Sequence, residues 1–381
     1  MNKKEVTEIK KQFTPTNCTI TRMCGCYIDG EKQKKTQFKE AFLSLPEEEM
    51  FKYFDIFRKS LSGTIGKNLL NMEFPLATEA EGGTQEFLLK LRNSKLTDET
   101  LLTEFYDRVI DSYTYNENYL ILLVHAAYDI PGKAKDGMEM FDASDEVYDF
   151  ILCTFCPVKL SNPALSYHAE ENCFHERIRD WIVAMPDAGF LFPAFNDRST
   201  DIHNLLYYSK NAENLENGLT DVLLGCVPPL TAKTQKETFH TVIEETLGDD
   251  CGYEVVKNIH ENLNELIEQH SDNPEPLALD KSEVKYLLAK SGVKDEQLED
   301  FDQHYDEVAG ANTCLLASNV ANMKKFEIKT PDITIAVSPE CADLVETRMI
   351  DGKQCLVITV DDRVEVNGIS ARTAFPVNKD F

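Results

Sequence analysis

Four apolar runs between residues 119 and 210 constrain the fold of this chain more than any other feature. Each has the length of a strand, and polar or Pro- and Gly-containing segments separate them. The runs cover residues 119–128, 147–158, 189–195 and 202–208. Because no long helical crossover joins consecutive runs, they predict an antiparallel sheet meander. The first run is apolar on both faces, so we expect it inside the sheet, with helices covering at least one face.

The segment before this meander predicts one strand and two helices. A strand over residues 18–28 carries apolar side chains at period two, and a turn follows it. These side chains are Ile20, Cys24, Cys26 and Ile28. One amphipathic helix begins near Pro46 and stops at Gly63. A second helix begins near Thr97, which predicts an N-cap.

Residues 213–309 return to helical periodicity, and the tail returns to strands. Asp280 and Glu283 predict a capping pair, and Asp351-Gly352 predicts a tight hairpin turn. The sequence therefore predicts an α+β protein, an antiparallel sheet meander flanked by helices, with a helical block and a C-terminal β segment. The expected domains are 1–230 for the sheet with its basic N-terminal segment, 231–310 for the helical block and 311–381 for the β hairpin segment.

Charge is distributed unevenly along the chain. The whole chain has a formal net charge of −27, which disfavours contact with nucleic acid and anionic lipid. Residues 1–67 differ, because 13 Lys or Arg against 9 Asp or Glu give this segment a net charge of +4. We therefore expect the amino-terminal end to be able to face a polyanion such as DNA. The residues predicted to contact DNA are Lys10, Lys11, Lys32, Lys34, Lys35, Arg58, Lys59 and Lys67.

The sequence shows no sign of a membrane or secretory segment. Its first residues lack an apolar core, and the run over residues 119–128 is too short to span a bilayer. Eleven cysteines, an odd number scattered through long segments, favour reduced thiols over a disulfide framework. We therefore predict a cytoplasmic protein without membrane association and without a cofactor.

Cys153 and Cys156 have the CxxC spacing that metal sites and redox motifs use. They lie in a predicted strand, however, where side chains three positions apart point to opposite faces. His168, Cys173 and His175 follow and could complete a set of zinc ligands, but no second pair of ligands has regular spacing. We therefore favour buried or half-buried thiols without a metal.

The densest polar constellation combines residues 175–180 with residues 196–203. If adjacent strands bring these two loops together, carboxylates, imidazoles and guanidiniums would converge as a hydrolytic site requires. The alternative is a pair of solvated turns with local ion pairs, which contribute little stability. The candidate catalytic residues are His175, Asp197, Arg198, Asp201 and His203.

Known nucleotide-binding and DNA-reading motifs do not fit this sequence. Residues 62–68 resemble a phosphate-binding loop only superficially, because Leu61 stands where its first glycine would be and Asn68 stands at its last position. Residues 280–290 and 295–308 have helix-turn-helix proportions, but the second segment is acidic and has no Lys or Arg. That segment cannot read a DNA groove, and it suits a scaffold that binds a basic protein.

Several segments resemble a bacterial family described as a domain of unknown function. They are residues 3–6, 12–15, 17–22, 24–27, 45–54 and 191–198, and the resemblance covers essentially the whole chain. It implies no activity, because the family has no established one. The order of elements more remotely resembles the nucleoid-associated proteins of the 37-kilodalton type, which are also acidic and cytoplasmic. That resemblance implies DNA binding, without a defined motif of binding residues.

Together these features predict a non-enzymatic cytoplasmic interaction protein that binds DNA without sequence preference through its basic amino-terminal segment. One alternative is a hydrolase that uses the cluster over residues 175–203. Another is an acidic scaffold for a protein partner. The sequence leaves the oligomeric state open.

Overall fold

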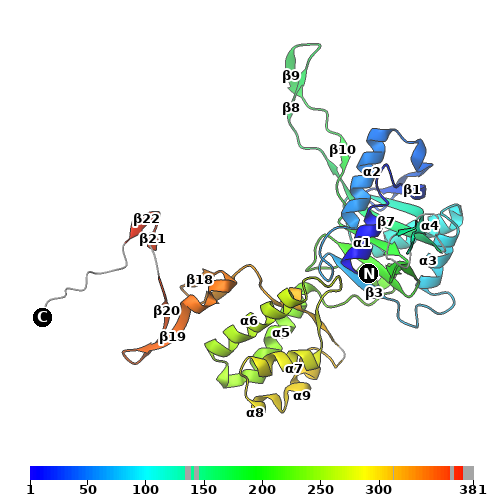
Figure 1. The fold of residues 1–381 in the computed structure, drawn as a ribbon. Coiled ribbons are helices and arrows are strands. Elements are labelled where there is room, and N and C mark those ends of the chain that lie inside the picture. Colours follow the sequence, from blue (N-terminus) through cyan, green and yellow to red (C-terminus); the bar gives the residue numbers. More distant parts are fainter. Residues whose placement is uncertain (134–138, 141–145, 312, 361–363, 372–381) are drawn as a thin grey trace. The chain divides into compact units, whose positions relative to one another are not determined.

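The computed structural model describes residues 1–133, 139–140, 146–311, 313–360 and 364–371. The chain divides into two compact units (Figure 1). The first unit contains residues 1–234 and 274–276, and the second contains residues 235–273 and 277–381. The expected boundary at residue 230 lies close to this division, whereas the expected boundary at residue 310 falls inside the second unit.

The first unit is built on an antiparallel sheet of eight strands. Seven strands follow one path: β2 (Lys34–Glu40), β1 (Ile20–Ile28), β4 (Tyr119–Ile130), β7 (Glu146–Leu160), β11 (Ala188–Phe192), β14 (Asn204–Ser209) and β3 (Leu69–Glu73). The eighth strand, β10 (Trp181–Val183), pairs with β7. Strands β4, β7, β11 and β14 are neighbours in chain order, which confirms the predicted meander and the α+β class.

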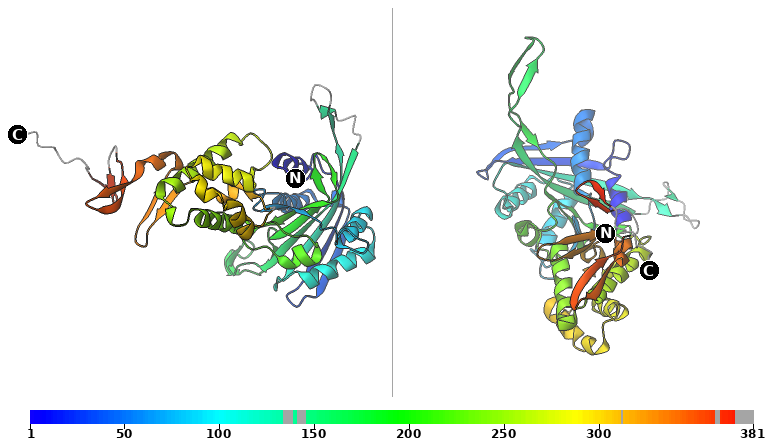
Figure 2. Two further views of the ribbon diagram at one scale, coloured as in Figure 1. Left: turned by 90° about the horizontal axis from the view of Figure 1, so that it is seen from below. Right: turned by 90° about the vertical axis from the view of Figure 1, so that its left-hand side faces the viewer.

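Helices cover both faces of this sheet (Figure 2). One face packs against α1 (Lys3–Lys10), the short helix η1 (Phe42–Ser44) and α2 (Glu47–Ser60). The other packs against α3 (Thr84–Asn93), α4 (Glu99–Ser112) and the π-helical turn η2 (Gly218–Leu223). Strand β4 is buried at every position from Tyr119 to Ala126. The expectation of helices on at least one face is therefore confirmed, and both faces are covered.

Two local predictions at element ends are wrong. Ile20 does not share a face with Cys24, because the pairing of β1 with β4 shifts between Ile20 and Arg22. Such a bulge inserts one residue and turns the following side chains to the other face. Helix α4 is capped by Asp98 rather than Thr97, since the Asp98 carboxylate accepts hydrogen bonds from the Thr100 and Leu101 amides.

Two short hairpins of the first unit form strand pairs of their own beside the large sheet. The predicted strand over residues 189–195 divides into β11 and β12 (Ala194–Asn196) at Pro193, whose nitrogen carries no proton for a strand ladder. Strand β12 pairs with β13 (Ser199–Asp201), and β5 (Gly132–Lys133) pairs with β6 (Glu139–Met140). Within the described part of the chain, no helix has both the length and the apolar character needed to cross a bilayer.

Strands β7 and β10 continue beyond the sheet as a two-stranded extension formed by β8 (Leu165–His168) and β9 (Cys173–Glu176). We call residues 158–183 the ribbon. Its register is unbroken: Leu160 faces Trp181, Leu165 faces Glu176 and His168 faces Cys173. Backbone hydrogen bonds from Ser161 to Asp180 and from Arg177 to Ala164 link the two paired parts. The ribbon extends away from the sheet (Figure 1).

The second unit combines helices with small hairpins. Its helices are α5 (Ala232–Leu247), η3 (Gly248–Asp250), α6 (Tyr253–Gln269), α7 (Lys281–Lys290), α8 (Asp295–Leu298), α9 (Phe301–Val308), α10 (Ala317–Val320) and η4 (Pro339–Leu344). Its strand pairs are β15 (Ala278–Leu279) with β16 (Leu315–Leu316), β17 (Phe326–Lys329) with β18 (Thr334–Val337), β19 (Val345–Ile350) with β20 (Lys353–Ile358), and β21 (Val364–Val366) with β22 (Ile369–Ala371).

Local signals in the second unit are partly confirmed. The capping pair of Asp280 and Glu283 forms at the start of α7. Asp351 and Gly352 both have positive φ in the turn between β19 and β20, as the predicted hairpin requires. The helix predicted over residues 295–308 is instead two helices, α8 and α9.

Candidate functional site

Cys153 and Cys156 lie on opposite faces of the sheet. Both are buried in β7, but each belongs to a different hydrophobic cluster. Cys153 packs in the cluster beneath α3 and α4, and Cys156 packs in the cluster beneath α1 and α2. Burial raises the pKa of both thiols, that of Cys156 to about 12. The two sulfur atoms cannot bind one metal ion, and both side chains serve the core.

Asp197 and Arg198 form the turn between β12 and β13. Both have positive φ, 51° and 56°, which matches a two-residue hairpin turn. The Arg198 guanidinium donates to the Glu8 carboxylate of α1, with a distance of 3.0 Å from Nη2 to Oε1. The same Glu8 oxygen accepts from the Tyr128 hydroxyl at 2.9 Å. These contacts give Arg198 a structural role between α1 and the hairpin.

Asp201 and His203 lie close to this turn, and the His203 backbone amide donates to Asp201 Oδ1 at 3.0 Å, but their side chains have different main partners. Burial opposes ionisation of Asp201, but hydrogen bonds from Asn196 and Asn204 outweigh it and lower the pKa of its carboxyl group. His203 Nδ1 lies 2.7 Å from Glu79 Oε1, and the hydrogen bond and charge of that carboxylate raise the pKa of His203. The structure therefore brings four of the five candidate catalytic residues to one hairpin and its flank.

His175 is the candidate that lies elsewhere, on β9 of the ribbon. Its Nε2 atom lies 2.7 Å from Glu171 Oε2 and 3.0 Å from Cys173 Sγ. The His168 ring lies on the same side, with its centroid 5.3 Å from the His175 ring. The convergence of the two polar loops that a hydrolytic site requires is therefore not formed around His175. Instead, the side chains around His175 are those that bind transition metals.

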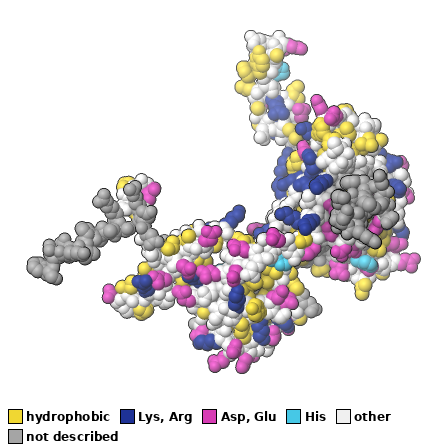
Figure 3. Space-filling model, in the orientation of Figure 1, with side chains coloured by type: hydrophobic (Ala, Val, Ile, Leu, Met, Phe, Trp, Pro, Cys, Tyr) yellow, Lys and Arg dark blue, Asp and Glu magenta, His cyan; other side chains and the backbone are white. Residues whose placement is uncertain are grey.

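The opposite face of the ribbon tip carries three apolar side chains together with Glu176, which lies across from Leu165. Successive side chains of a strand alternate between faces, so Leu165, Tyr167 and Phe174 lie opposite the His and Cys side chains. The rings of Tyr167 and Phe174 contact each other at 5.3 Å, yet these side chains are 54% and 66% exposed. Figure 3 shows apolar side chains along the ribbon. Further exposed apolar side chains towards its base are Ile178, Trp181, Ile182, Val183 and Met185.

An apolar groove lies where the ribbon joins the eight-stranded sheet of the first unit. It has a volume of about 400 Å³ between α2 and β10. Its lining residues are Tyr53, Ile56, Leu120, Ile182, Val183 and Met185, with Glu49, Lys52 and Asp55 beside them. The first unit therefore carries an exposed aromatic pair on the ribbon and an apolar recess at its base.

The residues predicted to contact DNA divide into two groups. Lys34 pairs with Asp107 at 2.5 Å, Lys35 pairs with Asp29 at 2.7 Å, and Lys32 donates to a backbone carbonyl of α4. Their charge is therefore largely compensated by neighbouring groups.

The second group lies where α1 and α2 end. Burial, followed by the nearby charges of Arg58 and Lys59, lowers the pKa of Lys10. Lys11 and Lys59 are exposed, and Arg58 pairs with Asp55. Lys67 is half-buried in the segment after α2. Figure 3 shows Lys and Arg side chains gathering on the first unit near the base of the ribbon.

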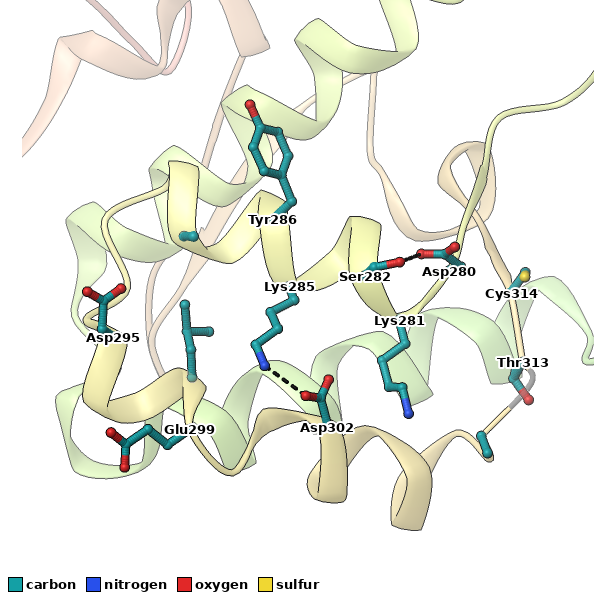
Figure 4. A pocket seen from close by; sticks show the side chains of 13 residues that line it. Asp280, Lys281, Ser282, Lys285, Tyr286, Asp295, Glu299, Asp302, Thr313 and Cys314 are labelled. Carbon is teal, nitrogen blue, oxygen red and sulfur yellow. Dashed lines mark hydrogen bonds and ion pairs between the residues drawn. The ribbon is translucent and has the colours of Figure 1, made fainter.

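A cavity of about 1010 Å³ in the second unit lies between α7 and the helices α8 and α9 (Figure 4). Its cations already have partners, because Lys285 pairs with Asp302 and Lys281 pairs with Asp306, both at 2.8 Å. The acidic segment predicted as a protein-binding scaffold is therefore partly neutralised within its own unit. Because these charged groups pair with one another, few of them are available to bind a ligand.

Sequence reasoning missed Glu171 as a neighbour of His175 and Cys173. The signal was present, because Cys173 and His175 are two residues apart and His168 stands across a short turn. A hairpin prediction for residues 165–176 would have placed these side chains on one face. Residues 175–180 were instead grouped with a polar loop, although Leu165, Tyr167 and Phe174 alternate with polar neighbours.

Comparison with known families gives a match over most of the chain. The model of a family described as "Domain of unknown function (DUF4317)" matches residues 1–369, which include nearly the whole chain. No curated protein matches the sequence. The more remote resemblance to nucleoid-associated proteins therefore has no support from these comparisons.

Proposed function

Because the chain belongs to the family described as Domain of unknown function (DUF4317), whose description states no activity, we propose a function from the geometry of its first unit. The protein is a non-enzymatic interaction protein that associates with a second copy of itself through the ribbon. The observation that carries this proposal is the exposed apolar face formed by Leu165, Tyr167 and Phe174.

The physical argument begins with the stability of the ribbon. A two-stranded hairpin is only marginally stable in water, and it gains stability from further strands or from packing of its apolar face. Among the residues that the structure describes, the tip of the ribbon has neither, because β8 and β9 pair there only with each other. Contiguous exposed apolar side chains mark interaction surfaces. Covering this face would therefore stabilise the ribbon.

A second copy is the partner that fits these observations best. One chain carries both an exposed aromatic pair, Tyr167 and Phe174, and an apolar groove beside α2. A twofold symmetric contact uses each surface twice, because the ribbon of one copy meets the groove of the other. Both surfaces belong to the same unit, so the contact needs no particular arrangement of the two units.

The test is the mass of the full chain in solution. We expect the weight-average mass in light scattering and sedimentation to rise with concentration from that of one chain towards that of two, and to reach about 1.5 chain masses at roughly 0.1 mM for an association of about −5.5 kcal/mol. The double variant Tyr167→Ser/Phe174→Ser should run as a single chain. Its matched control, Leu76→Ser/Val227→Ser, removes two even more exposed apolar side chains from outside the ribbon and should keep the larger mass.

Three results would count against self-association through the ribbon. The first is a single-chain mass for the unchanged protein throughout the concentration range. The second is an equal loss of mass in the control variant, which would indicate nonspecific stickiness. The third is a larger assembly that forms only with a different protein, which would move the ribbon to another partner.

The compartment we propose for this association is the cytoplasm. All eleven cysteines lie in described segments, and none is in a disulfide. Free thiols in this number suit a reducing compartment. Measuring free thiols on the protein isolated under alkylating conditions checks this, since disulfides would contradict it.

Binding of DNA without sequence preference is a second candidate, supported by the cations at the ends of α1 and α2. Lys10 lies close enough to Arg58 and Lys59 for their charges to lower its pKa, so positive charge is concentrated there. Lysines and arginines grouped in this way contact phosphates and release counterions on binding. This group is smaller than the sequence predicted, because Lys34 and Lys35 are paired with carboxylates.

Mobility shifts across a salt series test the DNA candidate. Three phosphate contacts predict a slope of about −3 when the logarithm of affinity is plotted against that of salt concentration. Reversing charge at Lys11 and Lys59 should abolish binding, whereas the matched reversal at Lys34 and Lys35 should leave most of it. Absence of binding at low salt, or equal losses in both variants, would remove this candidate.

A further inference from the structure

The tip of the ribbon gathers three side chains whose donor atoms suit one transition-metal ion, and the His168 ring lies beside them, with its centroid 5.3 Å from that of His175. Glu171, Cys173 and His175 each offer a ligand atom, and these atoms lie within 4.8 Å of one another. The Cys173 Sγ to Glu171 Oε2 distance is 3.5 Å, and the two distances from His175 Nε2 are 2.7 and 3.0 Å. Ligands on a tetrahedral ion with bonds of about 2.0–2.3 Å stand about 3.3–3.8 Å apart. Small outward rotations would therefore admit an ion.

The backbone explains why these side chains meet. Cys173 and His175 are two positions apart in β9, so they share a face, and His168 faces Cys173 directly across the ribbon. The turn between the strands contributes Glu171, and Asn172 takes a positive φ of 49° there. A hydrogen bond of 2.7 Å from the Tyr167 hydroxyl to Asn172 Oδ1 fixes this turn from the other face. The set is held by register and turn geometry together.

The donor set decides the class of metal. One sulfur, two imidazole nitrogens and one carboxylate oxygen suit Zn²⁺ and its analogues such as Co²⁺, whereas Ca²⁺ and Mg²⁺ prefer oxygen ligands alone. We propose that the ribbon tip binds one zinc-class ion through Cys173, His175, His168 and Glu171. On binding, the Cys173 thiol releases its proton to solvent, because the thiolate is the ligand.

A metal at this position would hold the two strands of the ribbon together. Cys173 and His175 belong to β9, His168 belongs to β8 and Glu171 belongs to the turn, so the ion crosslinks all three parts. Metal binding to a site that the unfolded chain lacks contributes to folding free energy. The ion therefore acts as a structural clip. This inference does not depend on self-association, since the ligands lie opposite the apolar face that the association uses.

Titration of the metal-free full chain with Co²⁺ alone tests the site, in the presence of a reductant that is not a thiol. We expect one Co²⁺ per chain, a thiolate-to-cobalt absorption band and the strong visible bands of a tetrahedral site, all lost when Zn²⁺ is added. Cys173→Ser should remove the thiolate band, and His175→Gln should weaken binding by at least about 10-fold. The matched control Cys251→Ser alters another exposed cysteine and should bind as the unchanged protein does.

X-ray absorption of the zinc-loaded protein gives a second measurement that does not rely on a variant. It should show one sulfur at about 2.3 Å and nitrogen or oxygen at about 2.0–2.1 Å. A saturated titration without a thiolate band would overturn the proposal. The proposal would also be overturned if Cys173→Ser bound the metal as the unchanged protein does while Cys251→Ser lost metal binding. Loss of metal binding in Tyr167→Ser/Phe174→Ser would show that the site needs the Tyr167–Asn172 hydrogen bond that fixes the turn. Loss of the two-chain mass with metal binding unchanged would concern self-association alone.

Discussion

Replacing Phe150 with alanine is expected to lower the free energy of unfolding of the first unit by about 3–5 kcal/mol. Phe150 is fully buried in β7, in the cluster beneath α1 and α2. Its ring stacks on Tyr148 at 4.7 Å and meets the edge of Phe13 at 6.2 Å. Removal of the ring leaves a cavity that a strand paired on both sides cannot close.

Urea unfolding followed by circular dichroism measures this loss, with Phe51→Ala as the matched control. Phe51 lies on α2 and is 39% exposed, so the same substitution should cost less than about 1 kcal/mol. A similar loss in both variants would show that the cluster beneath α1 and α2 does not hold the unit together.

Replacing Arg198 with alanine should lower the free energy of unfolding by about 1–3 kcal/mol. The Arg198 and Glu8 side chains are only 20% and 23% exposed, so the substitution leaves a half-buried carboxylate without its main partner. The ion pair also holds Arg198 at positive φ, a conformation that costs a non-glycine residue roughly 1 kcal/mol. Asp197→Asn is the matched control, because asparagine tolerates the same turn, and it should change stability by less than about 0.5 kcal/mol.

A double-mutant cycle isolates the ion pair itself. The variants are Glu8→Gln, Arg198→Ala and both together, and the expected coupling is about 1 kcal/mol or more. Additive losses would mean that the two side chains act independently. A measured coupling would show that Arg198 stabilises the contact between α1 and the hairpin of β12 and β13.

Signals that act within a few residues predicted much of the fold. The apolar run that became β4, the capping pair of Asp280 and Glu283, and the Asp351-Gly352 turn each depend on neighbouring residues alone. These features were read directly from spacing. The order of the meander followed as well, because short connections leave few ways to pair consecutive strands.

Features that depend on pairing between distant residues could not be predicted in the same way. The bulge near Ile20 exists only because β1 pairs with β4, about a hundred residues later. Strand β3 reaches the far edge of the sheet by pairing with β14, and no local pattern specifies that partner. The division at Glu299 and Asp300 between α8 and α9 was also missed, since apolar periodicity continues across it.

The candidate site shows the same limit. Sequence reasoning grouped His175 with Asp197 and His203 because all three lie in polar loops of one meander. The structure instead places His175 beside Glu171 and Cys173, because the ribbon register brings those side chains to one face. Polar composition indicated that the segment was exposed, but only the register shows which groups meet.

Trp181 is the sole tryptophan of the chain, and it lies at the base of the ribbon with 57% of its surface exposed. The buried aromatic side chains of the sheet are Phe and Tyr, so indole emission reports on the ribbon's surroundings and is nearly silent on the core. The emission of an indole moves to shorter wavelength when the ring leaves water. The emission of an indole that is already exposed to solvent changes little when the sheet unfolds. The chain thus contains its own fluorophore beside the surface proposed to dock, and stopped-flow mixing can follow that event without a chemical label.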